Sequence, residues 1–401
     1  MAWRLGIHHL WIDSLCIIQD DARDWKQEST KMNEIYENAF ITIAATASSS
    51  CEEGIRFSRQ PAECMDETQP FYVRRRADPE SLLEEPLYQR GWTLQETVLS
   101  RRLVHFAKDQ LYWSCRSVNH SEDEMYIVET STLEELCSQP GVAAHNLWWS
   151  WLEDYSRRKL SMPQDKLPAI AGLTRKFQSL AKMTPAVGLW MEDIHHGLLW
   201  QPTKPAARTL TDIPSWSWAS VDGPVRLLYH RAKGQPEDLH TQAVVKPQEL
   251  TVRWEGEQFT SRISQASLRI KGRLKQANYT TTYSQMFSLD YGSTWRRDLE
   301  YLPHGQLFHE GSWTSPRVSY LFFDDGQGPS HNREIWCLQL STNPPRGFTS
   351  QNTHNFLILQ PTGGSRDEYR RIGVGCVEDE QPLFRDYDLF RDVEVQEVVL
   401  V

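Results

Sequence analysis

Gly6-Ile-His-His-Leu-Trp-Ile-Asp-Ser-Leu-Cys-Ile-Ile-Gln-Asp-Asp21 is the stretch of sequence that decides the expected fold. Its residues 10–18 are apolar except for Asp13 and Ser14, a pattern typical of a strand that is covered on both faces. Apolar side chains then recur at three- and four-residue spacing over residues 24–39, which predicts a helix, and residues 40–47 form a second apolar run. Two strands joined by a helix predict a right-handed parallel crossover.

The acidic residues Asp20, Asp21 and Asp24 stand where the predicted strand meets the predicted helix. Carboxylates at this position can cap the helix, because they accept hydrogen bonds from its first backbone N–H groups. Carboxylates also bind Mg²⁺ or Ca²⁺, but the regular spacing and the glycine of an EF-hand loop are absent here. The pattern therefore favours capping, and we predict no metal site.

Several blocks within roughly the first 225 residues resemble the fungal heterokaryon-incompatibility (HET) domain and follow that family's order. They are Leu10 to Ile17, Gln19 to Asp21, Asp24-Trp25, Glu28, Met32, Ile35-Tyr36, Thr42 to Ala45, Arg90 to Glu96, Leu99 to Arg102, Tyr155 to Arg158, Asp165 to Ile170, Gly188 to Trp190 and Pro214 to Ser220. The family normally has a further strand and helix upstream, and this chain starts too late to contain them. The resemblance therefore implies an α/β fold with a parallel sheet like that of Toll/interleukin-receptor (TIR) domains, without its first strand.

HET domains are distantly similar to TIR domains, some of which cleave the nicotinamide bond of NAD. A serine, a tryptophan and a helical glutamate form the pocket in those relatives, and Ser14, Trp25 and Glu28 follow a similar order here. The resemblance implies Glu28 as the candidate catalytic carboxylate, with Ser14 and Asp13 beside it at the end of the predicted strand. The residues also allow a structural role, since Glu28 can pair with Lys31, and Asp13 and Ser14 can close a turn.

Arg90-Gly-Trp-Thr-Leu-Gln-Glu96 supplies further candidates for ligand binding. The guanidinium of Arg90 suits phosphate geometry, Glu96 can accept a ligand hydroxyl, and Trp25 and Trp92 can line the same site. Alternatively, Arg90 pairs with a carboxylate of the first block and Trp92 fills the core. These residues do not require a cofactor. In the hypothesis of an NAD-cleaving enzyme, NAD is the substrate.

The pattern of apolar and polar residues changes near residues 203–225. Before this point the patterns predict a strand at 71–74, a helix at 92–99, a hairpin of 102–106 with 111–115, and helices at about 143–160, 166–181 and 189–199. After it, short alternating runs predict strands at 242–245, 266–274, 318–323, 335–340, 356–360 and 369–377. We expect a HET-like α/β domain with a helical extension over residues 1–202, a Trp-rich packed connection over 203–225, and a mostly β module over 226–401.

The composition excludes several classes of protein. A net charge of −10 and a pI near 5.8 argue against nucleic-acid binding. No apolar run reaches the ~20 residues that span a membrane, and the first residues lack the pattern of a signal peptide, so we expect a cytoplasmic protein. The seven cysteines are widely spaced and contain no Cys-x-x-Cys pair, which predicts neither a disulfide framework nor a zinc site.

Three functional hypotheses follow from the sequence. The resemblance implies a protein of heterokaryon incompatibility, non-self recognition and programmed cell death, acting through protein partners or self-association. The second hypothesis is an NAD-cleaving hydrolase in which Glu28 is the essential carboxylate. The third is a truncated, inactive copy, because the upstream strand of the family is missing.

Overall fold

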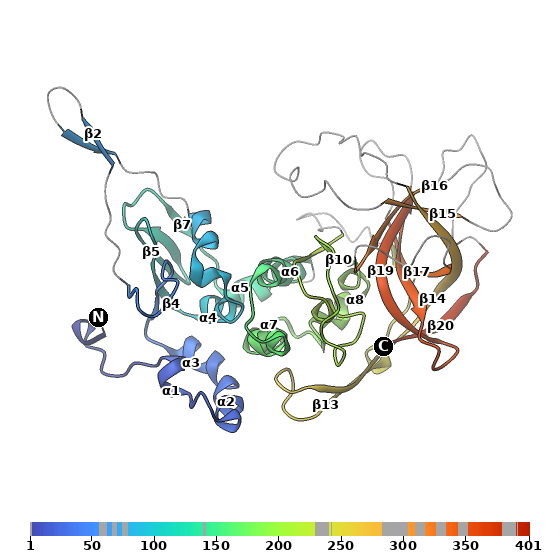
Figure 1. Cartoon of the computed structure of the whole chain (residues 1–401), viewed down its shortest axis with the longest axis horizontal. Coiled ribbons are helices and arrows are strands. Elements are labelled where there is room, and N and C mark those ends of the chain that lie inside the picture. The colour runs from blue at the N-terminus through green and yellow to red at the C-terminus, as the bar shows by residue number, and fades with distance from the viewer. Residues whose placement is uncertain are drawn as a thin grey trace. The chain divides into compact units, whose positions relative to one another are not determined.

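In the computed structural model of the chain, the described residues are 2–55, 62–65, 70–73, 79–138, 142–228, 240–241, 243–282, 304–308, 317–325, 334–343, 352–378, 390 and 392–401. Backbone contacts divide the chain into two compact units. Unit 1 contains Met1–Glu135, Asp165–Lys176 and Gln258–Thr260, and unit 2 contains Leu136–Gln164, Phe177–Glu257 and Ser261–Val401. Each unit therefore combines segments that are far apart in the sequence (Figure 1).

The strand predicted over residues 10–18 is wrong. This part of unit 1 contains the 3-10 helix η1 (Ala2–Leu5) and the single helical turn α1 (Asp13–Cys16), and residues 6–12 between them form no strand. Asp13 ends the extended backbone, because its Oδ1 accepts the N–H of Ser14 at 2.8 Å and its carbonyl accepts the N–H of Ile17 at 3.0 Å. Leu10 and Leu15 are exposed, so the expected burial on both faces is not present.

The helix predicted over residues 24–39 is two shorter helices, α2 (Ala22–Ser29) and α3 (Met32–Asn38). The hydroxyl of Ser29 donates to the carbonyl of Lys26 at 3.1 Å, and the hydroxyl of Thr30 donates to the carbonyl of Gln27 at 2.7 Å. Such bonds compete with the backbone bonds that would continue a helix. The helix therefore breaks at this polar pair, although the buried Met32 keeps the expected apolar face.

The main sheet of unit 1 is mixed, with the strand order β1-β4-β5-β6-β7. Figure 1 labels β4, β5 and β7 of this sheet. Its strands are β1 (Thr42–Ala44), β4 (Arg102–Phe106), β5 (Leu111–Cys115), β6 (Val118–Ser121) and β7 (Ile127–Glu129). β1 runs parallel to β4, and the other neighbours are antiparallel. The β4–β5 hairpin confirms the prediction, whereas the parallel crossover between residues 10–18 and 40–47 is wrong because the first run forms no strand.

The remaining elements of the first 135 residues are short. The segment predicted to hold one strand at 71–74 contains a pair, β2 (Ala62–Met65) and β3 (Pro70–Val73), and Arg74 lies outside the described residues. The 3-10 helices η2 (Pro79–Glu84) and η3 (Pro86–Gln89) lead to α4 (Thr93–Leu99), which confirms the helix predicted at 92–99. α5 (Leu133–Ser138) follows the sheet.

The helical part of unit 2 is built around tryptophans. Its longest helix, α6 (Val142–Arg157), confirms the predicted helix at 143–160. The segment predicted as a helix over 166–181 contains the 3-10 turns η4 (Pro163–Lys166) and η5 (Pro168–Ile170) and then α7 (Ala171–Ala181), and its part Asp165–Lys176 belongs to unit 1. The ring of Trp148 lies 5.0 Å from that of Trp190 and 5.2 Å from that of Phe177, measured between centroids.

The helix predicted over residues 189–199 is wrong. The chain instead forms the tight hairpin β8 (Pro185–Ala186) and β9 (Leu189–Trp190), the turn η6 (Met191–Asp193) and the short helix α8 (Ile194–Gly197). Val187 and Gly188 join the two strands at φ values of +47° and +83°. Positive φ at both central residues suits the twist of a two-residue hairpin, which a helix cannot contain. Strand β10 (Trp200–Pro202) follows and pairs with β11 (Val225–Leu227).

The C-terminal part of unit 2 is a mostly β module, as predicted. Its described strands are β12 (His240–Thr241), β13 (Leu250–Trp254), β14 (Ile263–Thr282), β15 (His304–Phe308), β16 (Arg317–Phe323), β17 (Glu334–Asn343), β18 (Thr353–Pro361), β19 (Glu368–Glu378) and β20 (Val395–Leu400). The pairings β14–β17–β18–β19–β20–β14 close a ring of strands, and only β19–β20 is parallel. The side chains of Leu268, Ile270, Leu338 and Leu400 are fully or almost fully buried and belong to the core of this module.

Among the described residues, no helix has the length and apolar character needed to cross a membrane.

Candidate functional site

The acidic residues at the start of α2 have structural partners. Asp21 is the N-cap of α2, and its Oδ1 accepts the backbone N–H groups of Arg23 at 2.8 Å and Asp24 at 3.4 Å. The carboxylate of Asp24 accepts the N–H of Ile18 at 2.8 Å. The capping interpretation is therefore confirmed for Asp21. Across the described part of the chain, no group of three or more His, Cys, Asp or Glu side chains is arranged to hold a metal ion.

Asp13 and Ser14 lie in the helical turn α1, and both side chains are exposed. Asp13 accepts the N–H of Ser14, and the side-chain amide of Gln19 donates to the carbonyl of Asp13 at 3.1 Å. These bonds fit the turn-forming role that Asp and Ser commonly have. The two residues therefore stand at the surface of a turn instead of at the end of a buried strand.

Glu28 lies on α2, one helical turn after Trp25. Its Oε1 accepts from the ammonium of Lys31 at 2.7 Å, which is the ion pair that the three-residue spacing allows. The side chain of Glu28 is one-fifth exposed and that of Lys31 about half exposed. A ligand that used the Glu28 carboxylate would have to compete with this ammonium group.

Trp25 and Trp92 come together from α2 and from the residue before α4. Their ring centroids are 5.9 Å apart and their planes are almost perpendicular, at 89°. The indole N–H of Trp92 donates to Oδ2 of Asp165 at 3.3 Å. Burial raises the pKa of Asp165 above its ordinary value, and the hydrogen bond from Trp92 opposes that shift. The edge-to-face geometry is a favourable aromatic contact, so the pair is held in a defined orientation.

Tyr36 on α3 connects the remaining predicted site residues. Burial raises the pKa of Tyr36 above its ordinary value, the negative charges of Glu96 and Asp13 and a hydrogen bond with Glu96 raise it further, and Arg90 acts in the opposite direction. The ring of Trp11 meets that of Tyr36 edge to face, with 5.8 Å between centroids. The structure therefore brings Asp13, Arg90 and Glu96 into one electrostatic neighbourhood around the phenol.

Tyr36 is not among the site residues that the sequence predicts. The available signal was the Ile35-Tyr36 pair, which belongs to the block that resembles the HET family. A phenol with a raised pKa keeps its proton at neutral pH and acts as a hydrogen-bond donor. Together with an accepting carboxylate on Glu96 and the exposed guanidinium of Arg90, this neighbourhood can bind a polar ligand that has both hydroxyl and anionic groups.

Helix α3 takes part in a network of charged side chains in unit 1 through Glu37. Lys176 donates to Oε1 of Glu37 at 2.7 Å and lies 3.7 Å from Oε1 of Glu134. Arg116 approaches the same two carboxylates, at 3.9 Å for Glu37 and 3.6 Å for Glu134. Alternating charges of this kind restrain one another's side chains and fix the position of α3.

His105 on β4 is a deeply buried imidazole of unit 1. Its side chain is 1% exposed, its ring stacks on that of Tyr88 at 5.8 Å, and its two nitrogens lie 3.4 Å from the hydroxyls of Thr46 and Ser114. Burial lowers the pKa of His105 to about 4. The imidazole is therefore neutral at physiological pH and serves the packing of the sheet.

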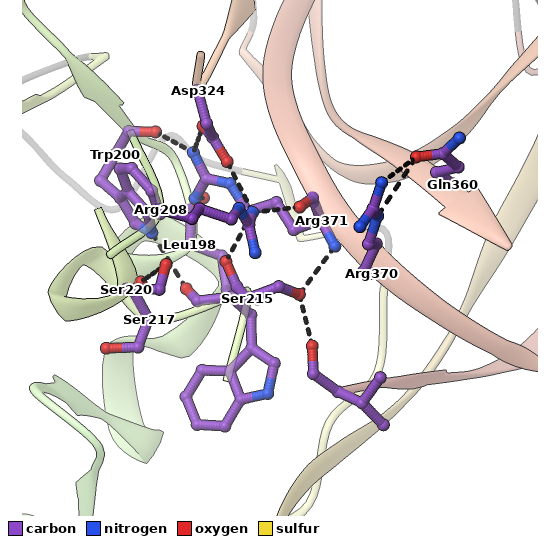
Figure 2. A network of polar contacts seen from close by, with 12 residues as sticks. Leu198, Trp200, Arg208, Ser215, Ser217, Ser220, Asp324, Gln360, Arg370 and Arg371 are labelled. Carbon is purple, nitrogen blue, oxygen red and sulfur yellow. Dashed lines mark hydrogen bonds and ion pairs between the residues drawn. The ribbon is translucent and has the colours of Figure 1, made fainter. Parts of the chain in front are cut away.

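The block Pro214 to Ser220 builds a polar core in unit 2, around Arg371 of β19 (Figure 2). Arg371 is fully buried and donates to the carbonyls of Leu198 at 2.9 Å and of Trp200, while its guanidinium carbon lies 3.4 Å from the Trp200 ring centroid. Ser215 accepts the backbone N–H of Arg371 at 2.9 Å. The block Pro214 to Ser220 therefore contributes to the packing of unit 2.

Asp324 neutralises this buried arginine. Its Oδ1 accepts from Arg371 at 3.1 Å and its Oδ2 accepts from Arg208 at 3.1 Å, and Figure 2 shows both guanidinium groups directed at the one carboxylate. Burial lowers the pKa of Arg371 to about 10, and the charge of Asp324 opposes that shift. A buried charge of this kind is tolerated only with a partner and satisfied hydrogen bonds.

Two tryptophans hold the hairpin between β8 and β9. The indole N–H groups of Trp148 and Trp218 both donate to the carbonyl of Gly188, at 3.2 and 2.9 Å. The hydroxyl of Ser217 donates to the carbonyl of Val187 at 2.7 Å. These bonds give Gly188, the first residue of the Gly188 to Trp190 block, a structural role.

The comparisons with known proteins concern the first part of the chain. No curated protein and no solved structure matches the chain. Residues 1–96 match the model of the family described as "Heterokaryon incompatibility protein (HET)", and this range contains Trp25, Glu28, Tyr36, Arg90 and Glu96. Residues 1–96 are therefore similar to a heterokaryon-incompatibility domain.

Proposed function

We propose that this protein acts in heterokaryon incompatibility, as a cytoplasmic component that recognises non-self after cell fusion and triggers growth arrest and programmed cell death. The match of residues 1–96 to the HET family supports this role. The family resemblance of the later blocks, up to Ser220, supports it further. In this proposal the protein works through contact with protein partners, including a second copy of the chain.

The observation that supports a mechanism based on protein contacts is the exposure of apolar side chains in residues 1–96, which we call the HET segment. Leu10, Leu15 and Ile18 are 64%, 78% and 56% exposed. Soluble proteins seldom leave several large aliphatic side chains exposed within nine residues unless the segment binds another molecule. A protein partner that covers these side chains would remove them from water and so gain hydrophobic free energy.

A second candidate function is hydrolysis of the nicotinamide–ribose bond of NAD, as the distant TIR resemblance implies. The grouping of Asp13, Arg90 and Glu96 around Tyr36 favours it, because carboxylates suit ribose hydroxyls and arginine suits phosphates. Glu28 would stabilise the developing positive charge on the ribose, with Ser14 and Asp13 nearby and Trp25 and Trp92 as aromatic walls. The Lys31 ammonium at 2.7 Å from Glu28 weakens this candidate.

Expression of the chain from an inducible promoter in a fungal host distinguishes the two candidate functions. Intracellular NAD and cell viability are followed together for the native chain, for Glu28→Gln and for Leu15→Asp. Glu34→Gln, an exposed carboxylate on α3, and Met125→Asp, an exposed apolar residue outside the segment, are the matched controls. All four substituted side chains are at least partly exposed, so we expect the variants to fold.

The contact mechanism predicts cell death with normal NAD, loss of killing in Leu15→Asp, and full killing in Glu28→Gln. If NAD falls before viability and Glu28→Gln prevents both, the hydrolase candidate is correct and the contact mechanism is wrong. An absence of any effect on viability in every strain would refute both candidates and leave the inactive copy.

A further inference from the structure

The long strand β14 presents cations on one face and aliphatic side chains on the other. Leu268 and Ile270 are fully buried and Leu274 is 4% exposed. Arg269 and Lys271 alternate with them, and their side chains are 49% and 52% exposed. Because successive residues of a strand point to opposite faces, these cations stand in a row outside the closed sheet.

Two more arginines extend this row. Arg273 follows Lys271 by two residues and donates from Nη1 to Oε1 of Gln339 at 3.4 Å. Arg253 of β13 pairs with Gln265, which precedes Arg269 by four residues and therefore shares its face. We refer to Arg253, Arg269, Lys271 and Arg273 as the cationic face.

The pairing register identifies what surrounds the cationic face. Lys271 is flanked by Glu397 of β20 on one side and by Val244 on the other, and Arg273 is paired with Val395. Val244 and Val395 are 52% and 62% exposed. Residues that are directly opposite in an antiparallel pair point to the same side of the sheet, so both valines border the cations.

Glu397 is the carboxylate that the register places among these cations. It makes an ion pair with Arg269, and its Oε2 lies 3.6 Å from the ammonium of Lys271. Among the side chains named here, four cations stand beside the single carboxylate of Glu397, although the whole chain carries a net charge of −10. Like charges at alternate positions of one strand repel each other, and an external anion would relieve that repulsion.

We propose that the cationic face is a docking surface for an extended acidic segment of a partner protein. Cations two residues apart on a strand are spaced by roughly 7 Å, which is also the spacing of alternate side chains in an extended peptide. Glutamates at alternate positions of the partner would meet Arg269 and Lys271, and Val244 and Val395 supply an apolar border of the kind found in protein interfaces. The net negative charge of the chain opposes nucleic acid as the occupant.

Glu397 acts in this proposal as an internal competitor for the partner's carboxylates. Its ion pair with Arg269 must be replaced when the acidic segment binds, because both carboxylates use the same guanidinium. Removal of the Glu397 charge therefore strengthens binding, whereas removal of Arg269 and Lys271 weakens it. A general attraction of acidic peptides to any cation of the protein predicts instead that removing two lysines elsewhere on the surface weakens binding as much as removing Arg269 and Lys271.

The test is fluorescence anisotropy of a labelled peptide in which glutamate alternates with threonine, titrated with the full chain. The native chain is compared with Arg269→Gln/Lys271→Gln, with Glu397→Gln, and with Lys159→Gln/Lys204→Gln, which removes two exposed lysines elsewhere in unit 2. A peptide with glutamine in place of glutamate, a single-stranded DNA and phosphatidylserine vesicles are tested in parallel. Circular dichroism of each variant verifies that it is folded.

We expect the acidic peptide to bind the native chain, with an affinity that decreases as salt increases. The double Arg269/Lys271 variant should lose about tenfold in affinity and Glu397→Gln should gain, while the Lys159/Lys204 control stays unchanged. Equal binding to all four proteins, or no binding of the acidic peptide, overturns the proposal. Binding of DNA or vesicles that depends on Arg269 and Lys271, with no peptide binding, overturns it as well and identifies a different occupant.

Discussion

Asp324 holds two guanidinium groups in the interior of unit 2, and each occupies a different oxygen of the carboxylate. Removing one partner from a buried ion pair leaves an uncompensated charge in a medium that solvates it poorly. Asp324→Asn would leave Arg371, which is fully buried, without its counter-charge and next to the cation of Arg208. Asp324 is therefore the carboxylate that compensates both guanidinium groups.

We expect Asp324→Asn to lower the free energy of unfolding of unit 2 by about 3–5 kcal/mol. Urea unfolding followed by tryptophan fluorescence measures the change, because Trp148, Trp200, Trp216 and Trp218 are buried in this unit. Asp367→Asn changes an exposed carboxylate of the same module and should shift stability by less than about 0.5 kcal/mol. Equal stability of the native chain and Asp324→Asn would show that the carboxylate does not compensate the buried arginine.

His105 makes unit 1 sensitive to acid. Its pKa is about 4 in the folded chain, against an ordinary value of 6.5, so the unfolded chain takes up a proton at the higher pH. The stability contributed by the neutral imidazole is complete above pH 6.5 and is lost as the pH falls from 6.5 towards 4, by about 3 kcal/mol in total. Acid should therefore loosen the contacts of His105 with Tyr88, Thr46 and Ser114.

Amide-exchange protection of β4 and β5 in the full chain, compared at pH 7 and pH 5, measures this effect. The native chain should lose protection at the lower pH, and His105→Gln, which cannot gain a proton in this range, should show a smaller loss. His8→Gln changes an exposed imidazole and should retain the native dependence. The same loss of protection in His105→Gln as in the native chain would disprove the role of His105.

For single residues, the sequence predicts contacts between near neighbours in the chain but not contacts between residues that are far apart in it. Asp21 was recognised as a cap because capping depends on local spacing. The pairing of Glu28 with Lys31 was foreseen for the same reason. The neighbourhood of Tyr36 with Glu96 depends on how α3 meets α4, which are separated by more than fifty residues, and local spacing contains no information about such a contact.

Among the elements, the hairpin between β8 and β9 shows how tertiary contacts override a local pattern. Val187 adopts a φ of +47°, which β-branched residues rarely do, and its side chain is 2% exposed. The carbonyls of Val187 and Gly188 accept hydrogen bonds from Ser217, Trp148 and Trp218. These distant donors hold a turn directly before residues 189–199, which the sequence pattern alone assigns to a helix.

Gly188→Ala should destabilise this hairpin by about 2 kcal/mol or more. A Cβ at position 188 would lie 2.6 Å from Nε1 of Trp218, and the φ of +83° is itself unfavourable for alanine. Near-ultraviolet circular dichroism and the thermal midpoint measure the loss of tryptophan packing. Gly363→Ala is the matched control, because it has a φ of +82° but no atom within 4 Å of the added Cβ, so the difference between the two variants isolates the contact with Trp218.

Other elements were predictable from the sequence because their signals are local. The β4–β5 hairpin has alternating residues on both sides of Lys108 and Asp109, and the six strands predicted for the C-terminal module include cores of β14, β16, β17, β18 and β19. The strand predicted at residues 10–18 failed because apolar content does not distinguish a buried strand from an exposed apolar segment. Leu15 is exposed because of how the folded unit packs, and the apolar pattern of residues 10–18 contains no information about that packing.

For the whole molecule, unit 1 extends beyond the match to the HET family. Gln95 accepts the N–H of Gly172 at 3.2 Å, Glu37 accepts from Lys176 at 2.7 Å, and Trp92 donates to Asp165 at 3.3 Å. All three contacts join the first 135 residues to the segment Asp165–Lys176 of the same unit. The HET segment therefore depends on residues that follow it at a distance in the chain.

A fragment that ends at Glu135 should lose these three contacts, each worth about 1 kcal/mol, and should exchange the amides of α3 and α4 faster than the full chain does. A longer fragment that runs through Lys176 retains the contacts and should recover protection at Gln95 and Glu37. Hydrogen exchange with mass spectrometry compares the two fragments. Equal protection in both would mean that the first 135 residues are stable without the later segment.

The interleaved segments also set an order of events on the ribosome. Unit 1 begins at the N-terminus but receives its last segment, Gln258–Thr260, long after its sheet has been translated. At ordinary rates of synthesis this interval is on the order of ten seconds. During that time the nascent HET segment emerges with Leu10, Leu15 and Ile18 available to chaperones before the unit that contains it is complete.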